Sequence, residues 1–154
     1  MNQSAPVNPS ALPPGFAALG DAHLWQLPWT AFFCSVRCPG TLVLRAFDLA
    51  HHLRATATPV ISGFHSPVEQ EVLNILLCST VPVCLVLAHR LPRRQPGLWR
   101  RPLAERRLLV LSPFREETRR GTVDTAAHRN ALVAAAATRI VVAYAAGGGK
   151  TERF

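Results

Sequence analysis

The stretch TPVISGFHSPVEQEVLNILLCSTVPVCLVLA, residues 58–88, decides the fold of this chain. Its two apolar runs, at 58–62 and 82–88, have the length and composition of buried strands. Between them, residues 68–78 place Val68 and Val72 on one apolar stripe at helical spacing. A strand, an amphipathic helix and a second strand in this order predict two parallel strands joined by a right-handed crossover.

The same alternation continues on both sides of this stretch. The further expected elements are strands at 30–34, 107–114 and 139–145, helices at 41–55 and 122–138, and an Arg- and Pro-rich connection at 89–106 that ends in a short helix. Strands that are apolar throughout are typical of a sheet covered on both faces. We therefore predict an α/β fold of the Rossmann-like, doubly wound type, with a mostly parallel sheet of about five strands and helices on both faces.

The chain of 154 residues is long enough for one domain with a sizeable core. Residues 1–23 are rich in Pro, Asn, Ser and Gly, and we expect them to form a flexible N-terminal arm. Residues 24–154 are then the Rossmann-like domain.

Basic residues outnumber acidic ones, with 17 Lys and Arg against nine Asp and Glu, and Lys150 is the single Lys. An excess of Arg favours anionic partners, because the guanidinium group grips phosphate with two parallel hydrogen bonds. Residues 90–120 hold ten Arg and three Glu, with Trp99 and Phe114 as candidate rings on which bases of single-stranded DNA can stack. A solvated basic surface is the alternative interpretation.

Several classes of protein are not expected. No segment has 18 uncharged apolar residues, which argues against a membrane span, and the N-terminus lacks the pattern of a signal peptide. The four cysteines do not have the spacing of a zinc site or a C-x-x-C motif. Cys34, Cys78 and Cys84 sit in apolar runs, so we expect them to be reduced core residues of a cytoplasmic protein. The histidines are scattered, and we predict no metal site and no cofactor.

Ligands of open α/β sheets bind beyond the carboxyl ends of the strands, and the first such loop here is CSVRCPGT. Ser35, Arg37 and Gly40 precede an expected helix, whose free N–H groups and dipole favour an anion. Arg37 can add a bidentate contact to a phosphate. A tight turn at Pro39 and Gly40 explains the same residues without a ligand.

The second loop joins the strand at 58–62 to the helix at 68–78. Ser66 and Glu69 fit the capping box S-x-x-E, which is a purely structural role. That role does not explain Gly63 and His65. Gly63 lets a ligand approach the backbone closely, so Ser62, Gly63, His65 and Ser66 are candidate ligand-binding residues.

The third loop, AAGGGKTE, follows the last expected strand. A P-loop requires a Gly five places before Gly149, and that residue is Tyr144, so a P-loop is excluded. A Gly-rich anion-binding loop remains, made of Gly147, Gly148, Gly149, Lys150 and Thr151. The segment also weakly resembles the PGG-GT-E loop of lysine-decarboxylase-like (LOG) nucleotide phosphoribohydrolases, in which Glu152 would be a catalytic carboxylate.

Four stretches resemble the DNA-processing protein A (DprA/Smf) superfamily, close to its small Rossmann-like nucleotide-binding members. They are CSVRCPG, VISGFHSPVEQEVL, RLLVLSPF and HRNALVAAAATRIVVAYAAGGGKT, in the family's order, and the resemblance covers roughly residues 24 to 152. The last stretch is similar to the family's RN-RIIAGLS segment, which makes Arg129 and Asn130 candidate phosphate-site residues. Residues 64–69 depart from the family's Ser-Gly-x-Ala-x-Gly-Ile-Asp pattern, so a ligand other than the family's is an alternative.

This resemblance implies a Rossmann-like domain that binds a phosphate-containing ligand, either a nucleotide or single-stranded DNA, at the carboxyl edge of the sheet. It also implies self-association. The family's sheet usually continues past the Gly-rich loop, so a domain truncated at its C-terminus is an alternative. The absence of a nucleophile motif and of clustered metal ligands favours a non-catalytic binding domain. A LOG-like phosphoribohydrolase is the alternative.

Overall fold

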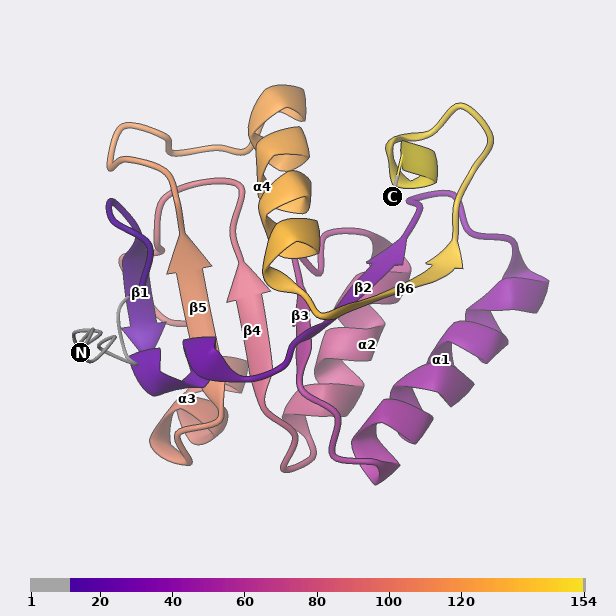
Figure 1. Cartoon of the computed structure of the whole chain (residues 1–154), viewed down its shortest axis with the longest axis horizontal. Coiled ribbons are helices and arrows are strands. Elements are labelled where there is room, and N and C mark those ends of the chain that lie inside the picture. Colours follow the sequence, from indigo (N-terminus) through magenta and orange to yellow (C-terminus); the bar gives the residue numbers. More distant parts are fainter. Residues whose placement is uncertain (1–11, 154) are drawn as a thin grey trace, which may run out of the picture.

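The structure of the chain, a computed structural model, describes residues 12–153, except for the side chains of Lys150 and Arg153. Strands and helices alternate along most of the chain (Figure 1). The strands are β1 (Ala17–Gly20), β2 (Thr30–Cys34), β3 (Val60–Ser62), β4 (Val83–Val86), β5 (Leu108–Ser112) and β6 (Arg139–Tyr144). The α-helices are α1 (Gly40–Ala55), α2 (Pro67–Leu77), α3 (Gly97–Ala104) and α4 (Val123–Ala136), and the 3-10 helices are η1 (Ala22–Gln26) and η2 (Lys150–Arg153).

The strands form one six-stranded sheet in the order β1-β5-β4-β3-β2-β6. Only β1 runs antiparallel to its neighbour, so the α/β, mostly parallel architecture expected from the sequence is confirmed. From β2 to β5 each crossover moves in the same direction, whereas the crossover from β5 to β6 returns across the sheet. Because both kinds of crossover are right-handed, α1, α2 and α3 lie on one face and α4 lies on the other (Figure 1).

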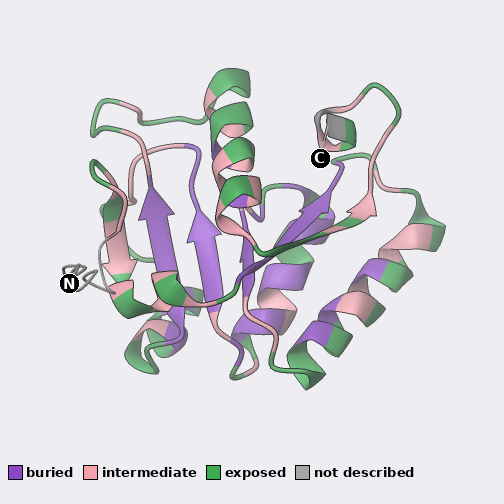
Figure 2. Ribbon diagram, in the orientation of Figure 1, coloured by how far each residue is buried: buried purple, intermediate pink, exposed green. Residues whose placement is uncertain are grey.

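The central strands are buried along their length (Figure 2). Since side chains alternate between the two faces of a strand, these strands contribute to two apolar layers. Phe32 and Val60 point to the layer beneath α1, α2 and α3. Ala31 and Ile61, their neighbours in sequence, point to the layer that contains Val133 of α4. Residues from the N-terminal part of the chain complete the second layer beside α4. None of the helices in residues 12–153 is both long and apolar enough to cross a membrane.

The sheet has one strand more than expected, because β1 lies within the stretch that composition predicted to be a flexible arm. Ala17 to Gly20 pair with Ser112 to Leu109, which extends the sheet beyond β5. Asp21 then caps η1 and accepts hydrogen bonds from the guanidinium of Arg106 at 3.0 and 2.8 Å. The stretch 1–11 of the expected arm lies outside the described residues.

Gly20 provides a test of β1. Its φ of +98° lies in the left-handed region, and a Cβ atom there would overlap the carbonyl oxygen of Leu108. We expect Gly20→Ala to lower the free energy of unfolding by about 1–3 kcal/mol in urea titrations. Gly97→Ala is the matched control, since a Cβ at Gly97 meets no atom within 4 Å. Equal stability of the two variants would contradict the pairing of β1 with the sheet.

Candidate functional site

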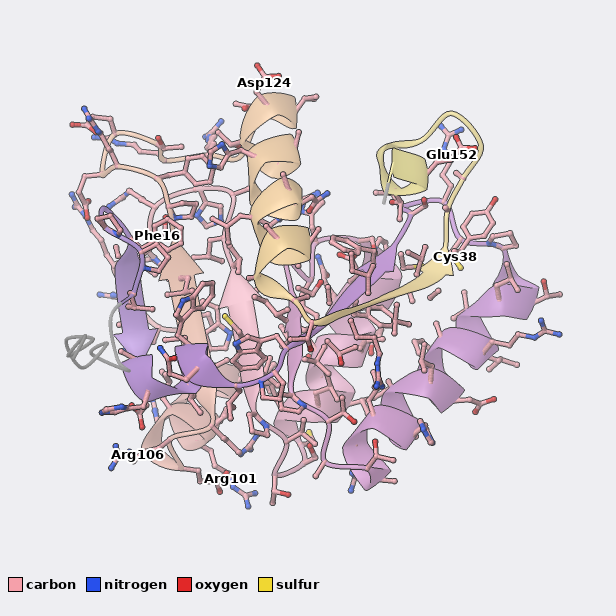
Figure 3. The ribbon with its side chains drawn as sticks, in the orientation of Figure 1. Phe16, Cys38, Arg101, Arg106, Asp124 and Glu152 are labelled. Carbon is pink, nitrogen blue, oxygen red and sulfur yellow. The ribbon has the colours of Figure 1, made fainter. Side chains whose placement is uncertain are left out.

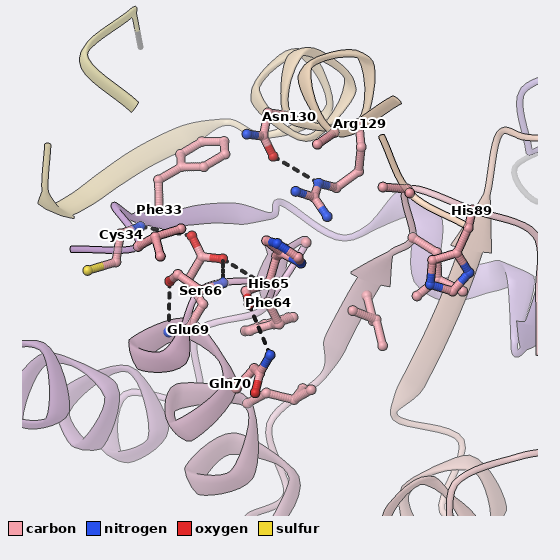
Figure 4. A pocket seen from close by; sticks show the side chains of 18 of the residues that line it. Phe33, Cys34, Phe64, His65, Ser66, Glu69, Gln70, His89, Arg129 and Asn130 are labelled. Atoms are coloured by element: carbon pink, nitrogen blue, oxygen red, sulfur yellow. Dashed lines mark hydrogen bonds between the residues drawn. The ribbon is translucent and has the colours of Figure 1, made fainter. Parts of the chain in front are cut away.

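The carboxyl ends of β2, β3 and β4 open into a cavity of about 810 Å³ (Figure 4). The loop from β3 to α2 forms its floor, and the N-terminal half of α4 forms one wall. The strand order reverses at β2, whose two neighbours in the sheet are β3 and β6. The connection that leads into β3 crosses one face of the sheet, and the connection that leads into β6 crosses the other (Figure 1). A doubly wound sheet binds its ligands at such a point. Val36 and Val123, which are 64% and 66% exposed, flank the cavity.

The carboxylate of Glu69 connects three segments beneath this cavity. Its Oε1 accepts a hydrogen bond from the Cys34 N–H at 2.9 Å, and its Oε2 accepts from the N–H groups of His65 and Ser66 at 2.8 and 3.2 Å. The Ser66 hydroxyl accepts from the Glu69 N–H, which completes the predicted capping box at the start of α2. Burial raises the pKa of Glu69, while the three N–H groups favour its charged form.

Arg129 reaches the cavity from α4 and lies directly over Gly63. A Cβ atom at Gly63 would overlap the Cδ, Nε and Cζ atoms of Arg129, so the guanidinium requires a glycine there. Its Nε donates to Asn130 Oδ1 at 2.8 Å, which fixes the orientation of the fork. Arg129 is 5% exposed, and burial lowers its pKa while the charge of Glu69 raises it.

The terminal amino groups of Arg129 are available to a ligand. None of the ion pairs found among the described side chains includes Arg129. The guanidinium lines the cavity above His65 (Figure 4). A buried cation whose hydrogen-bonding fork opens into a cavity fits a phosphate or another planar anion.

The structure brings together six of the residues predicted from the sequence. Gly63, His65, Ser66, Arg129, Asn130 and Thr151 all line the cavity. They come from three segments that are far apart in the chain: the β3–α2 loop, α4 and η2. Their role in binding stays a prediction.

The other predicted residues do not line the cavity. Ser35 is buried, and its Oγ accepts a hydrogen bond from the Ala146 N–H at 2.9 Å, so it ties the loops after β2 and β6 together. Ser62 is buried too, and its Oγ accepts from the Phe64 N–H at 3.1 Å. The residues outside the cavity lining also include Arg37 and Gly40, which are exposed, and Gly147, Gly148 and Gly149. The Lys150 side chain lies outside the described part of the chain.

Some residues of the site were not predicted as such. Glu69 was assigned only a capping role, because its hydrogen bond to Cys34 joins residues that no local pattern relates. Trp99, expected to be a surface ring, is only 7% exposed and forms part of the cavity wall. It faces inward because α3 packs on the sheet through Trp99 and Pro102. Within residues 12–153, no three His, Cys, Asp or Glu side chains gather as metal ligands.

The structural role of Glu69 can be measured. We expect Glu69→Gln to lower the free energy of unfolding by about 1–3 kcal/mol at pH 7, because the amide NH₂ group cannot accept from a buried backbone N–H. Glu71→Gln, an exposed change on the same helix, is the control and should stay within about 0.5 kcal/mol of the native chain. If urea titrations gave the same stability for both variants, Glu69 would not hold this edge of the sheet together.

Two solved structures share this fold at low sequence identity. One describes the single-stranded DNA binding mode of DNA processing protein A from Helicobacter pylori, with a TM-score of 0.69 and 18% identity over 90% of this chain. The other is DNA processing protein A from Streptococcus pneumoniae, with a TM-score of 0.71 and 17% identity over 88% of this chain. This chain spans 65% and 48% of those two chains. No protein-family model and no curated protein matches its sequence. The likeness shows that this chain has the fold of the part of DNA processing protein A that it matches.

Proposed function

We propose that this chain is a non-catalytic domain that binds single-stranded DNA at the carboxyl edge of its sheet. The observation that carries the proposal is the guanidinium of Arg129, which is buried over Gly63, oriented by Asn130 and open to the cavity. Burial of this cation costs free energy, which the charge of Glu69 offsets in part and a bound anion offsets further. A backbone phosphate of the DNA supplies that anion.

The surroundings of the cavity favour a chain of phosphates over a single one. The N-terminus of α4 lies at the cavity through Thr122 and Val123, and it adds the positive end of a helix dipole. Arg119 and Arg120 precede it on the β5–α4 loop, and both are exposed and absent from the ion pairs of the described side chains. Exposed arginines beside a phosphate site extend it into a path for a polyanion.

The similarity of fold adds support from outside the chain. The Helicobacter pylori structure concerns the binding of single-stranded DNA by DNA processing protein A. The resemblance seen in the sequence leads to the same family through the strand-end motifs. Self-association, which that resemblance implies, and a cytoplasmic location, which the cysteine pattern indicates, stay predictions.

A mononucleotide in the same cavity is the second candidate, and its phosphate would use the same arginine. A LOG-like phosphoribohydrolase is less well supported. Its expected catalytic carboxylate, Glu152, accepts a hydrogen bond from the Gly148 N–H at 2.6 Å within its own loop, and it is not among the residues that line the cavity. Glu69, which does line it, is held by three backbone N–H groups.

The proposal predicts that Arg129 contributes strongly to the binding of DNA. We expect Arg129→Met to weaken the binding of a fluorescein-labelled oligothymidine about tenfold to 100-fold, since a charge-assisted hydrogen bond contributes about 1.5–3 kcal/mol. Arg54→Met is the control, because Arg54 is an exposed residue at the far end of α1, on the opposite edge of the sheet. Fluorescence anisotropy at two salt concentrations measures both variants.

The outcomes separate the candidates. Binding that weakens steeply with salt and resists AMP and ATP supports single-stranded DNA. Displacement of the oligonucleotide by AMP or ATP at comparable concentrations would assign the cavity to a mononucleotide. An equal loss of affinity in the Arg129 and Arg54 variants would overturn the assignment of the site.

Gly63→Ala tests the same site without removing any charge. The added Cβ would displace the flexible guanidinium of Arg129, so we expect the affinity for oligothymidine to fall at least about tenfold. Stability should change little, because the end of a long side chain can move aside. Thermal unfolding checks that point, and Gly97→Ala serves as the matched control. Undiminished affinity would show that the position of Arg129 over Gly63 is not needed.

A further inference from the structure

A second, more open depression of about 510 Å³ lies at the same edge of the sheet, above β1 and β5. Phe16, which precedes β1, and Phe114, which follows β5, contribute the rings that line it. Both are partly exposed, and the start of β1 lies beside the end of β5 because the two strands are antiparallel (Figure 3). Neither of these partly exposed rings lines the cavity under α4.

The ring of Phe114 is held in place. Its backbone N–H donates to Ser112 Oγ at 3.2 Å, and Ser112 Oγ donates to the carbonyl oxygen of His89 at 2.7 Å. The ring packs edge-on against His128 of α4, with ring centroids 5.6 Å apart and an angle of 62° between the planes. A ring fixed in this way offers a stacking surface at little cost in conformational entropy.

The charges around this depression favour a base over a phosphate. Arg115, Glu116 and Glu117 share its lining with the two rings. Glu116 is paired with Arg90 at 3.2 Å. The two remaining charges of the lining, those of Arg115 and Glu117, are opposite and sum to zero. A phosphate gains little from a locally neutral site, whereas any nucleobase has a face that stacks on an aromatic ring.

The β5–α4 loop joins this depression to the cavity under α4. Its first residues line the depression, and Gly121 at its end lines the cavity. Arg119 and Arg120 lie on the loop between the two and are exposed. The depression lies between β1 and β5, and Arg129 lies over the end of β3, so about two and a half strand spacings separate the two sites. At about 4.8 Å per strand, the distance is about 12 Å. About four nucleotides cover that distance at a stacked rise of about 3.4 Å.

We propose that the depression between Phe16 and Phe114 is a second subsite, which stacks one base of the same DNA strand whose phosphate binds Arg129. This inference rests on the proposed function. Arg119 and Arg120 bind the intervening phosphates. Oligonucleotides that are too short to span both sites use the cavity alone.

The experiment compares a thymidine dinucleotide with an eight-nucleotide strand in which 2-aminopurine replaces one base at a time. We expect stacking on Phe114 to change the 2-aminopurine fluorescence at one position, about four nucleotides from the base nearest Arg129. Phe114→Leu should remove that change in fluorescence and weaken the binding of the eight-nucleotide strand about fivefold to 100-fold. The affinity for the dinucleotide should stay the same. Phe114→Trp, which keeps an aromatic ring, should retain both the fluorescence change and the affinity for the eight-nucleotide strand. Phe16→Leu should cause a smaller loss of both.

Phe47→Leu on α1 is the control for loss of an aromatic ring away from this edge. If Phe114→Leu and Phe16→Leu left the longer strand as tightly bound as in the native chain, while Arg129→Met weakened it, the subsite would be wrong and the proposed function would stand. If the native chain bound neither oligonucleotide, both would be wrong. If Phe114→Leu weakened the binding of the dinucleotide as much as that of the longer strand, Phe114 would belong to the first site, and the proposal of a separate second subsite would be wrong.

Discussion

The carboxylate of Glu69 is the constraint on which the carboxyl edge of the sheet depends. One oxygen holds the end of β2, and the other holds the loop that follows β3, so two neighbouring strands end in a fixed relation to the start of α2. The carboxylate is buried, and its charge raises the pKa of Arg129. The site thus has a floor made of backbone N–H groups that are already satisfied. Above it lies a cation that forms no ion pair with any side chain that the structure describes.

The order of the strands explains why α4 supplies that cation. Since the crossover from β5 returns over the sheet to β6, α4 passes above β3, where Gly63 leaves room for the Arg129 side chain. The loop that precedes α4 carries arginines along the edge toward β1. One long connection therefore supplies the cavity wall, the exposed arginines and the ring of Phe114.

Local patterns in the sequence predicted most of the fold. Residues 30–34 form a strand as expected, and the S-x-x-E spacing identified the cap of α2, because both depend on neighbours along the chain. β1 was missed because four residues, AALG, carry no alternation and pair only across a long range. The inward position of Trp99 and the hydrogen bond from Cys34 to Glu69 depend on how distant segments pack, which spacing does not encode.

The central claim is that single-stranded DNA binds at the carboxyl edge of the sheet, and chemical-shift mapping by NMR tests it most directly. On addition of an eight-nucleotide oligothymidine, the amide signals of Gly63, His65, Thr122 and Asn130 should shift together. Signals at the opposite edge, such as that of Ala57, should stay in place. Shifts confined to the opposite edge, or no shift at saturating DNA, would contradict the account.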